Sequence, residues 1–202
     1  MRLFAWTLAA LLAVCVGVPG QASASVTVKE KTVHYRISGV TGVALLKAMD
    51  RRGPKHGFRT RAIAQTSYSP AWTIEWRETA KDCRVERVSG VVSVTYTFPQ
   101  AADALSPGMN RRWRAFLAGV TKHERMHGKI ATQMARAVEK SISRLKISND
   151  PGCRKARRET KRRMAEIYAD YERKQYRFDA LEHREGGKVE RLIDALVLAP
   201  GV

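Results

Sequence analysis

The sequence is organised around residues 113–135, which read Trp113-Arg-Ala-Phe-Leu-Ala-Gly-Val-Thr-Lys-His-Glu-Arg-Met-His-Gly-Lys-Ile-Ala-Thr-Gln-Met-Ala135. Apolar side chains recur in and after this segment at spacings of three and four, the period of an amphipathic helix. The buried stripe of that helix would carry Phe116, Val120, His123, His127, Ile130, Met134 and Val138. The opposite side carries Arg111, Arg114, Lys122, Arg125, Lys129 and Arg136. The segment therefore predicts a long helix with two histidines on its buried face.

The two histidines and the glutamate between them form an H-E-x-x-H motif. His123 and His127 lie about one helical turn apart, so both imidazoles can reach one metal ion, with Glu124 beside it. This order is typical of a zinc site in which the glutamate accepts a proton from the metal's water. The same letters also arise by chance, and a buried histidine can be a hydrogen-bonded core residue. Because two histidines and a glutamate occur together at this spacing, we favour the metal site over a core histidine.

The first 24 residues are expected to be a secretory signal peptide. Arg2 is followed by an apolar run over 3–18 and by small residues at 22–24, which resemble a cleavage site. The run is short for a retained membrane anchor, and Val14 is bulkier than the small residue that a lipoprotein signal needs before Cys15. We therefore expect a mature chain that begins at Ser25 and is secreted or periplasmic.

Residues 25–202 are expected to form one domain, because 202 minus 24 leaves 178 residues, enough for a single core. No other long apolar run occurs, so no transmembrane segment is expected after the signal is removed. Cys83 and Cys153 are then the two cysteines of the exported chain, and an oxidising compartment favours a disulfide between them. Cysteine ligation of zinc is the less favoured alternative, because neither cysteine belongs to a C-x-x-C pair.

Charge is the strongest compositional signal. The chain has 37 Lys and Arg against 19 Asp and Glu, a net charge of +18, and this field attracts polyanions such as anionic lipids, cell-wall polymers or nucleic acid. The densest basic run is 154–163, although such runs are usually solvated helix faces. Because the run has no aromatic residue on which bases could stack, no specific nucleic-acid partner is expected.

The remaining patterns predict an α+β fold, with a small antiparallel sheet followed by long helices. Strands are expected within 26–37, 58–68, 71–78 and 85–98, with turns at or near 81–83 and 89–90. Thr41 can cap a short helix that stops at Gly53-Pro54. After about Pro107 the pattern is helical: the motif helix to about 145, a turn at 148–152, a second long helix, and a short last helix near Leu192.

A catalytic zinc ion keeps three protein ligands, so a third must join His123 and His127. The other histidines of the mature chain are His34, His56 and His183. His183 ends the second long helix, which an antiparallel return would bring beside the first. His34 on a strand and His56 in a loop are expected to be surface or structural residues.

Several stretches together match one family pattern. They are Ile37-Ser-Gly39, Arg52-Gly-Pro54, residues 72–76 from Trp72 to Trp76, Cys83, the 123–127 motif, Cys153, and residues 178–187. The chain resembles the bacterial family called domain of unknown function 922, whose members are described as predicted secreted zinc-dependent proteases of the zincin type. Members tend to close with Tyr-Asp, then Thr, then His-Gly. Here Phe178 stands in place of the Tyr, the Thr is missing, and Arg184 follows His183, so Asp179 and Glu182 stay open as third ligands.

The expected function is thus zinc-dependent hydrolysis of a peptide or protein substrate outside the cytoplasm, with Zn²⁺ held by His123, His127 and His183. Glu124 would be the general base. The candidate oxyanion donors are Tyr171, Tyr176 and Arg177. The alternative is a non-catalytic basic envelope protein that binds an anionic polymer or surface, with its metal structural or absent.

Overall fold

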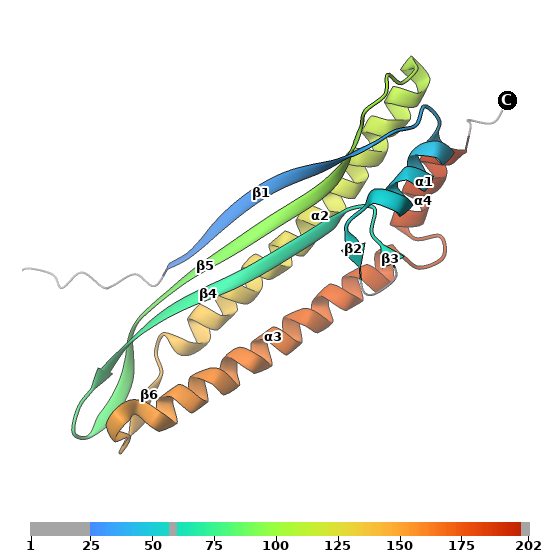
Figure 1. Cartoon of the computed structure of the whole chain (residues 1–202). Coiled ribbons are helices and arrows are strands. Elements are labelled where there is room, and N and C mark those ends of the chain that lie inside the picture. Colours follow the sequence, from blue (N-terminus) through green and yellow to red (C-terminus); the bar gives the residue numbers. More distant parts are fainter. Residues whose placement is uncertain (1–24, 57–59, 199–202) are drawn as a thin grey trace, which may run out of the picture.

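The computed structural model describes residues 25–56 and 60–198, and it has an α+β architecture (Figure 1). Its elements in chain order are β1 (Ser25–Ile37), α1 (Gly42–Arg52), β2 (Lys55–His56), β3 (Thr60–Arg61), β4 (Gln65–Glu78), β5 (Asp82–Ala101), α2 (Pro107–Ile142), β6 (Lys146–Ser148), a 3₁₀ turn (Pro151–Cys153), α3 (Arg154–Glu182) and α4 (Lys188–Val197). The three long strands run along α2 in about the same direction, and α3 runs beside α2 (Figure 1). The expected signal peptide lies outside the described residues. In the part of the chain that the structure describes, no helix combines the length and the apolar character needed to cross a membrane.

The sheet is mixed, so the prediction of an antiparallel sheet was wrong in this respect. Its long strands are ordered β1-β5-β4; β4 and β5 are antiparallel, whereas β1 and β5 are parallel. The short β6 adds to β5 in antiparallel orientation. A parallel pair requires a long connection, and here α1 and strands β2 to β4 provide it. Local alternation of side chains indicates a strand but carries no information about the direction of its partner.

The turn predicted at or near 89–90 is also absent, because β5 continues through it. Gly90 pairs with Trp72 of β4, and a Cβ atom at Gly90 would lie 2.5 Å from the indole ring. The glycine therefore makes room for an aromatic ring across the strand pair, a role of strand glycines that resembles a turn signal in sequence. The turn predicted near Lys81 is present, where Thr79 Oγ1 accepts hydrogen bonds from the backbone N–H groups of Lys81 and Asp82.

The predicted helices are present, with local caps. The Ala44 N–H donates to Thr41 Oγ1 at the start of α1, and the Met109 N–H donates to Ser106 Oγ at the start of α2. The predicted stripe of α2 is buried, including His123, and His127 is mostly buried. Helix α2 ends at Ile142, slightly before the predicted position.

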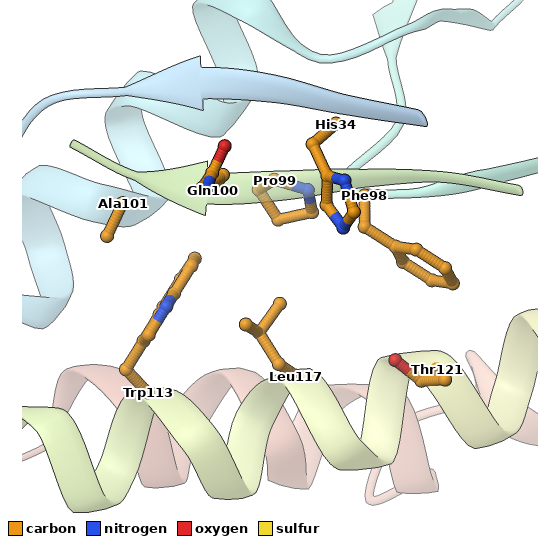
Figure 2. A pocket seen from close by; sticks show the side chains of 8 residues that line it. All are labelled: His34, Phe98, Pro99, Gln100, Ala101, Trp113, Leu117 and Thr121. Atoms are coloured by element: carbon orange, nitrogen blue, oxygen red, sulfur yellow. The ribbon is translucent and has the colours of Figure 1, made fainter. Parts of the chain in front are cut away.

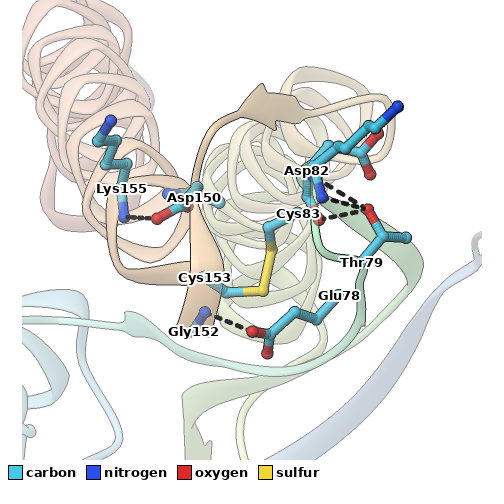
Figure 3. The surroundings of a disulfide bond; sticks show 10 residues. Glu78, Thr79, Asp82, Cys83, Asp150, Gly152, Cys153 and Lys155 are labelled. Atoms are coloured by element: carbon cyan, nitrogen blue, oxygen red, sulfur yellow. Dashed lines mark hydrogen bonds between the residues drawn. A yellow bond between two sulfur atoms is a disulfide. The ribbon is translucent and has the colours of Figure 1, made fainter.

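The predicted disulfide between Cys83 and Cys153 is present and joins the start of β5 to the start of α3 (Figure 3). Its sequence separation is 70 residues, so in the chain-entropy view the bond would stabilise the fold by about 4 kcal/mol. Beside it, the buried Asp150 carboxylate accepts hydrogen bonds from the backbone N–H groups of Lys155 and Ala156 at 2.9 and 2.8 Å. These contacts fix where α3 begins. A disulfide of this kind is typical of proteins in an oxidising compartment.

Helix α2 approaches β5 closely beside the motif. Tyr96 of β5 is 1 % exposed, and its hydroxyl donates to Glu30 of β1 at 3.0 Å. The guanidinium carbon of Arg125 lies 4.5 Å from the centre of the Tyr96 ring. A Cβ atom at Gly128 would lie 2.0 Å from the Tyr96 hydroxyl oxygen. The glycine that follows His127 therefore lets the motif helix lie against the sheet.

We expect Gly128→Ala to lower the free energy of unfolding by about 1–3 kcal/mol, because the added methyl group overpacks a buried contact with Tyr96. Gly108→Ala is the matched control, because it lies in the same helix and a Cβ atom there would meet only Arg111, at 3.9 Å. That control should be neutral or slightly stabilising. Urea unfolding of both variants measures the difference. Equal stability of the two variants would contradict the proposed packing role of Gly128.

Candidate metal centre

The two motif histidines converge on one point. Their Nε2 atoms are 3.2 Å apart on adjacent turns of α2. Two nitrogen ligands that bind one zinc ion tetrahedrally, each about 2.0–2.1 Å from the ion, lie roughly 3.4 Å from each other. The spacing of His123 Nε2 and His127 Nε2 therefore fits a shared metal ion.

Helix α3 brings further donors to the same point, as the predicted antiparallel return requires. Asp179 Oδ1 lies 2.9 Å from His127 Nε2 and 3.4 Å from His123 Nε2. His183, the residue that caps the end of α3, has its Nε2 4.0 Å from the same Asp179 oxygen. Donor atoms of His123, Asp179 and His183 all lie within 4.8 Å of one another. Asp179 is therefore a nearer third donor than His183, the residue expected from sequence.

Gln175 holds His127 in a defined orientation. Its Oε1 lies 2.6 Å from His127 Nδ1, and its amide nitrogen donates to the His127 carbonyl oxygen at 3.2 Å. An amide oxygen only accepts, so the contact requires a proton on Nδ1, and in the neutral ring this leaves Nε2 free for a metal. Sequence reasoning missed Gln175. The available signal was its position one turn before Asp179 on the inner face of the second helix.

His123 is placed by different neighbours. The ring of Phe178 stacks on its imidazole with centroids 4.9 Å apart. Among the described residues, His123 Nδ1 is buried without a hydrogen-bond partner, and its nearest carboxylate oxygen, Glu182 Oε2, is 3.6 Å away. Glu182 is also ion-paired with Lys188 at 3.2 Å. A small shift of Glu182 would let Nδ1 donate to it, an outer contact that metal-bound histidines commonly make. Glu182 thus fits the role of orienting His123 better than that of a ligand.

The charges of the centre are strongly coupled. Burial lowers the pKa of His127, but the Asp179 carboxylate and the Gln175 amide oxygen outweigh it, so the pKa is raised overall. Burial raises the pKa of Asp179, yet hydrogen bonds from His123 and His127 bring it well below its usual range. Burial and the charge of His123 lower the pKa of His183. A metal ion at His127 would therefore compete with a proton that Asp179 stabilises.

Glu124 lies on a different side of α2, toward β4. It is 6 % exposed, and the Thr66 hydroxyl lies 2.6 Å from Glu124 Oε2 and 2.9 Å from the Glu124 carbonyl oxygen. Glu124 Oε1 has no hydrogen-bond partner among the described residues, so one oxygen of the carboxylate is held and the other is available. Thr66 was not predicted, because nothing in its local sequence indicates a contact with a residue 58 positions away.

The other two histidines of the expected mature chain are His34 and His56, and neither is among the described donors of the metal centre. His34 is exposed on β1 and lines a separate cavity of about 220 Å³, whose walls include Phe98 of β5 and Trp113 of α2 (Figure 2). No motif residue lines that cavity. His56 belongs to β2 and not to a loop as expected, and its side chain lies outside what the structure describes.

The three candidate oxyanion donors differ in exposure. Tyr171 is half-buried on the face of α3 that also carries Gln175 and Phe178, and the Lys174 ammonium lies 3.8 Å from the centre of its ring. Tyr176 is 67 % exposed and Arg177 is exposed. Tyr171 is therefore the one of the three on the inner face of the helix.

A family model described as "Bacterial protein of unknown function (DUF922)" matches residues 32–187. The chain belongs to this family. The match to DUF922 includes α2, α3, Thr66 and every histidine and carboxylate of the metal centre. No curated protein and no solved structure matches the chain.

For this DUF922 chain we expect Asp179→Ala to lower zinc affinity by more than ~100-fold, because it removes the nearest third donor. Even the loss of a residue that only hydrogen-bonds to a metal ligand lowers metal affinity by about 10- to 100-fold. His183→Ala should cost less than ~10-fold. Asp170→Ala is the control, the same substitution on α3 at a carboxylate paired with Lys174. Competition with a chromophoric zinc chelator measures all three. A large loss in His183→Ala with none in Asp179→Ala would instead identify His183 as the ligand.

Proposed function

We propose that the chain is a zinc-dependent peptidase of the zincin type that acts outside the cytoplasm. The observation that carries the proposal is the convergence of His123 Nε2 and His127 Nε2, which are 3.2 Å apart. Asp179 Oδ1 of α3 lies 3.4 and 2.9 Å from these two nitrogens, close enough to bind the same ion. Glu124, one residue after the first histidine, has one oxygen fixed by Thr66. The donor types, their spacing and the anchored glutamate all fit a zinc ion.

A bound zinc ion would lower the pKa of a coordinated water and polarise a carbonyl group. The residues of the chain would supply the proton transfers. Glu124 Oε1, which has no partner among the described residues, would accept a proton and later release it to the leaving amine, while Thr66 holds Oε2. Gln175 would keep the His127 ring in one orientation during these steps.

The strand beside Glu124 supports a peptide as the substrate. Within the described part of the chain, β4 is an edge strand, since its one partner is β5. Thr66, near the start of β4, contacts Glu124 directly. An extended peptide could add to the free edge through main-chain hydrogen bonds and so lie beside the glutamate. The disulfide fits an exported enzyme.

A second candidate function follows from the number of donors. His123, Asp179 and His183 offer three donor atoms within 4.8 Å of one another, and His127 Nε2 lies 2.9 Å from the Asp179 oxygen. With a shift of one side chain, these four residues could fill all four positions of a tetrahedral ion. A closed site of this kind is structural, and the protein would then be a basic envelope protein that binds an anionic polymer or surface. The two candidates differ in whether Glu124 has any chemical role.

The substitution Glu124→Gln separates them. It preserves the size of the side chain but removes the proton acceptor, so zinc content should be unchanged and cleavage should fall by roughly 10²- to 10⁴-fold. Glu139→Gln, the same change further along α2, is the control and should retain the parent's activity.

Cleavage of a denatured protein and of a mixed peptide pool is measured at matched zinc occupancy. Equal cleavage by the parent and Glu124→Gln would remove Glu124 from its role. A zinc-loaded parent that cleaves neither substrate would favour the structural-metal candidate.

A further inference from the structure

The solvent face of α2 carries a row of cations that has no part in the metal centre. The α2 cation row consists of Arg111, Lys122, Lys129, Arg136 and Lys140, all exposed. At about 100° per residue, these five side chains fall within roughly 40° of one another around the helix. Arg114 and Arg125 form a flanking pair along one side of the row. The cations therefore form a line and not a scattered surface.

The row is long and contains no carboxylate. From its first to its last member it extends about 44 Å, and Lys122, Lys129 and Arg136 are spaced by about 10.5 Å. The two acidic residues of α2 lie elsewhere on the helix, because Glu124 is buried against Thr66 and Glu139 is half-buried. No charge of opposite sign on α2 interrupts the row.

The row is also unpaired. In the ranges 25–56 and 60–198, none of its five side chains makes an ion pair or hydrogen bond, and of the flanking pair only Arg125 does, with Glu30. The basic run 154–163 on α3 is different. There Glu159 pairs with both Arg162 and Arg163, and Arg157 lies over the Trp76 ring. Arg154, Arg158 and Lys161 of that run make no ion pair among the described residues, so the charge of the run is only partly neutralised or covered, whereas the α2 cation row is unpaired throughout.

We propose that the α2 cation row binds a linear phosphate polymer, which lies along the helix and contacts several of the five side chains. A line of cations, three of them spaced by about 10.5 Å, matches the repeating charge of such a chain. The binding free energy comes largely from released counterions. The solvent face of α2 has no exposed aromatic residue, so a nucleic acid gains no stacking contact. A bilayer fits less well, because a single row of cations contacts a flat surface along one line only. Met126 is the one large apolar side chain of α2 that is exposed, so the helix has little apolar surface to insert into lipid.

The row and the metal centre can be used at the same time. His123 is turned by about 100° from Lys122, toward α3, and the sheet lies on the side of α2 opposite the row. A polymer on the row would therefore leave the histidines and Glu124 uncovered. Binding to the row does not depend on the proposed peptidase function.

The test compares two triple variants that remove the same charge. Lys129→Gln, Arg136→Gln and Lys140→Gln remove three members of the row, and Arg154→Gln, Arg158→Gln and Lys161→Gln remove three exposed cations of α3. The probe is long-chain inorganic polyphosphate, with affinity measured from about 50 to 200 mM salt. Vesicles with about 30 % phosphatidylglycerol are the second probe. Circular dichroism and thermal unfolding check that both triple variants fold.

The α2 triple variant should bind polyphosphate more than ~10-fold more weakly than the parent at low salt, and the slope of log affinity against log salt should fall by about 2, near 0.7 per lost contact. The α3 triple variant should lose much less. Equal losses would show that net charge alone attracts the polymer and would overturn the proposal. The proposal would also be overturned if the parent failed to bind polyphosphate at low salt. The same holds if the α2 triple variant lost binding to the vesicles but not to polyphosphate.

Discussion

The antiparallel return of α3 along α2 is the constraint on which the candidate site depends. Asp179 and His183 lie more than 50 positions after His123 in the sequence, and they meet it because the disulfide and the Asp150 contacts fix where α3 begins. Near its other end α3 is less tightly packed, since its fully buried residues are Ala156 and Thr160 near the disulfide. The end of α3 that carries the donors therefore has more room to adjust when an ion binds than the end that anchors it.

Helix α2 serves three different surfaces along its 36 residues. One face packs on the sheet, where Gly128 allows close contact with Tyr96. A second face presents His123 and His127 to α3, and a third carries the α2 cation row to solvent. A single continuous helix thus fixes the relative positions of the motif histidines and the α2 cation row, because neither is carried on a loop.

The features that sequence could predict are those with a local cause. The period of three and four placed both histidines on one helix face, and Thr41 marked the start of α1. Outside the expected signal peptide, the sequence has two cysteines that could pair. The parallel pairing of β1 with β5 was missed, because strand direction depends on the whole chain path. Gly90 was misread as a turn signal, since its partner Trp72 is visible only across the sheet. Thr66 and Gln175 were missed for the same reason: their roles arise from contacts between distant segments.

The central claim is that the donors of α2 and α3 hold one zinc ion. Anomalous diffraction at the zinc edge, on crystals of the mature protein grown with zinc, tests it most directly. The account predicts one strong peak at bonding distance from His123 Nε2 and His127 Nε2, with a donor atom of α3 as the third protein ligand. A folded protein whose crystals show no zinc at this point, or zinc only on surface residues elsewhere, would contradict the account.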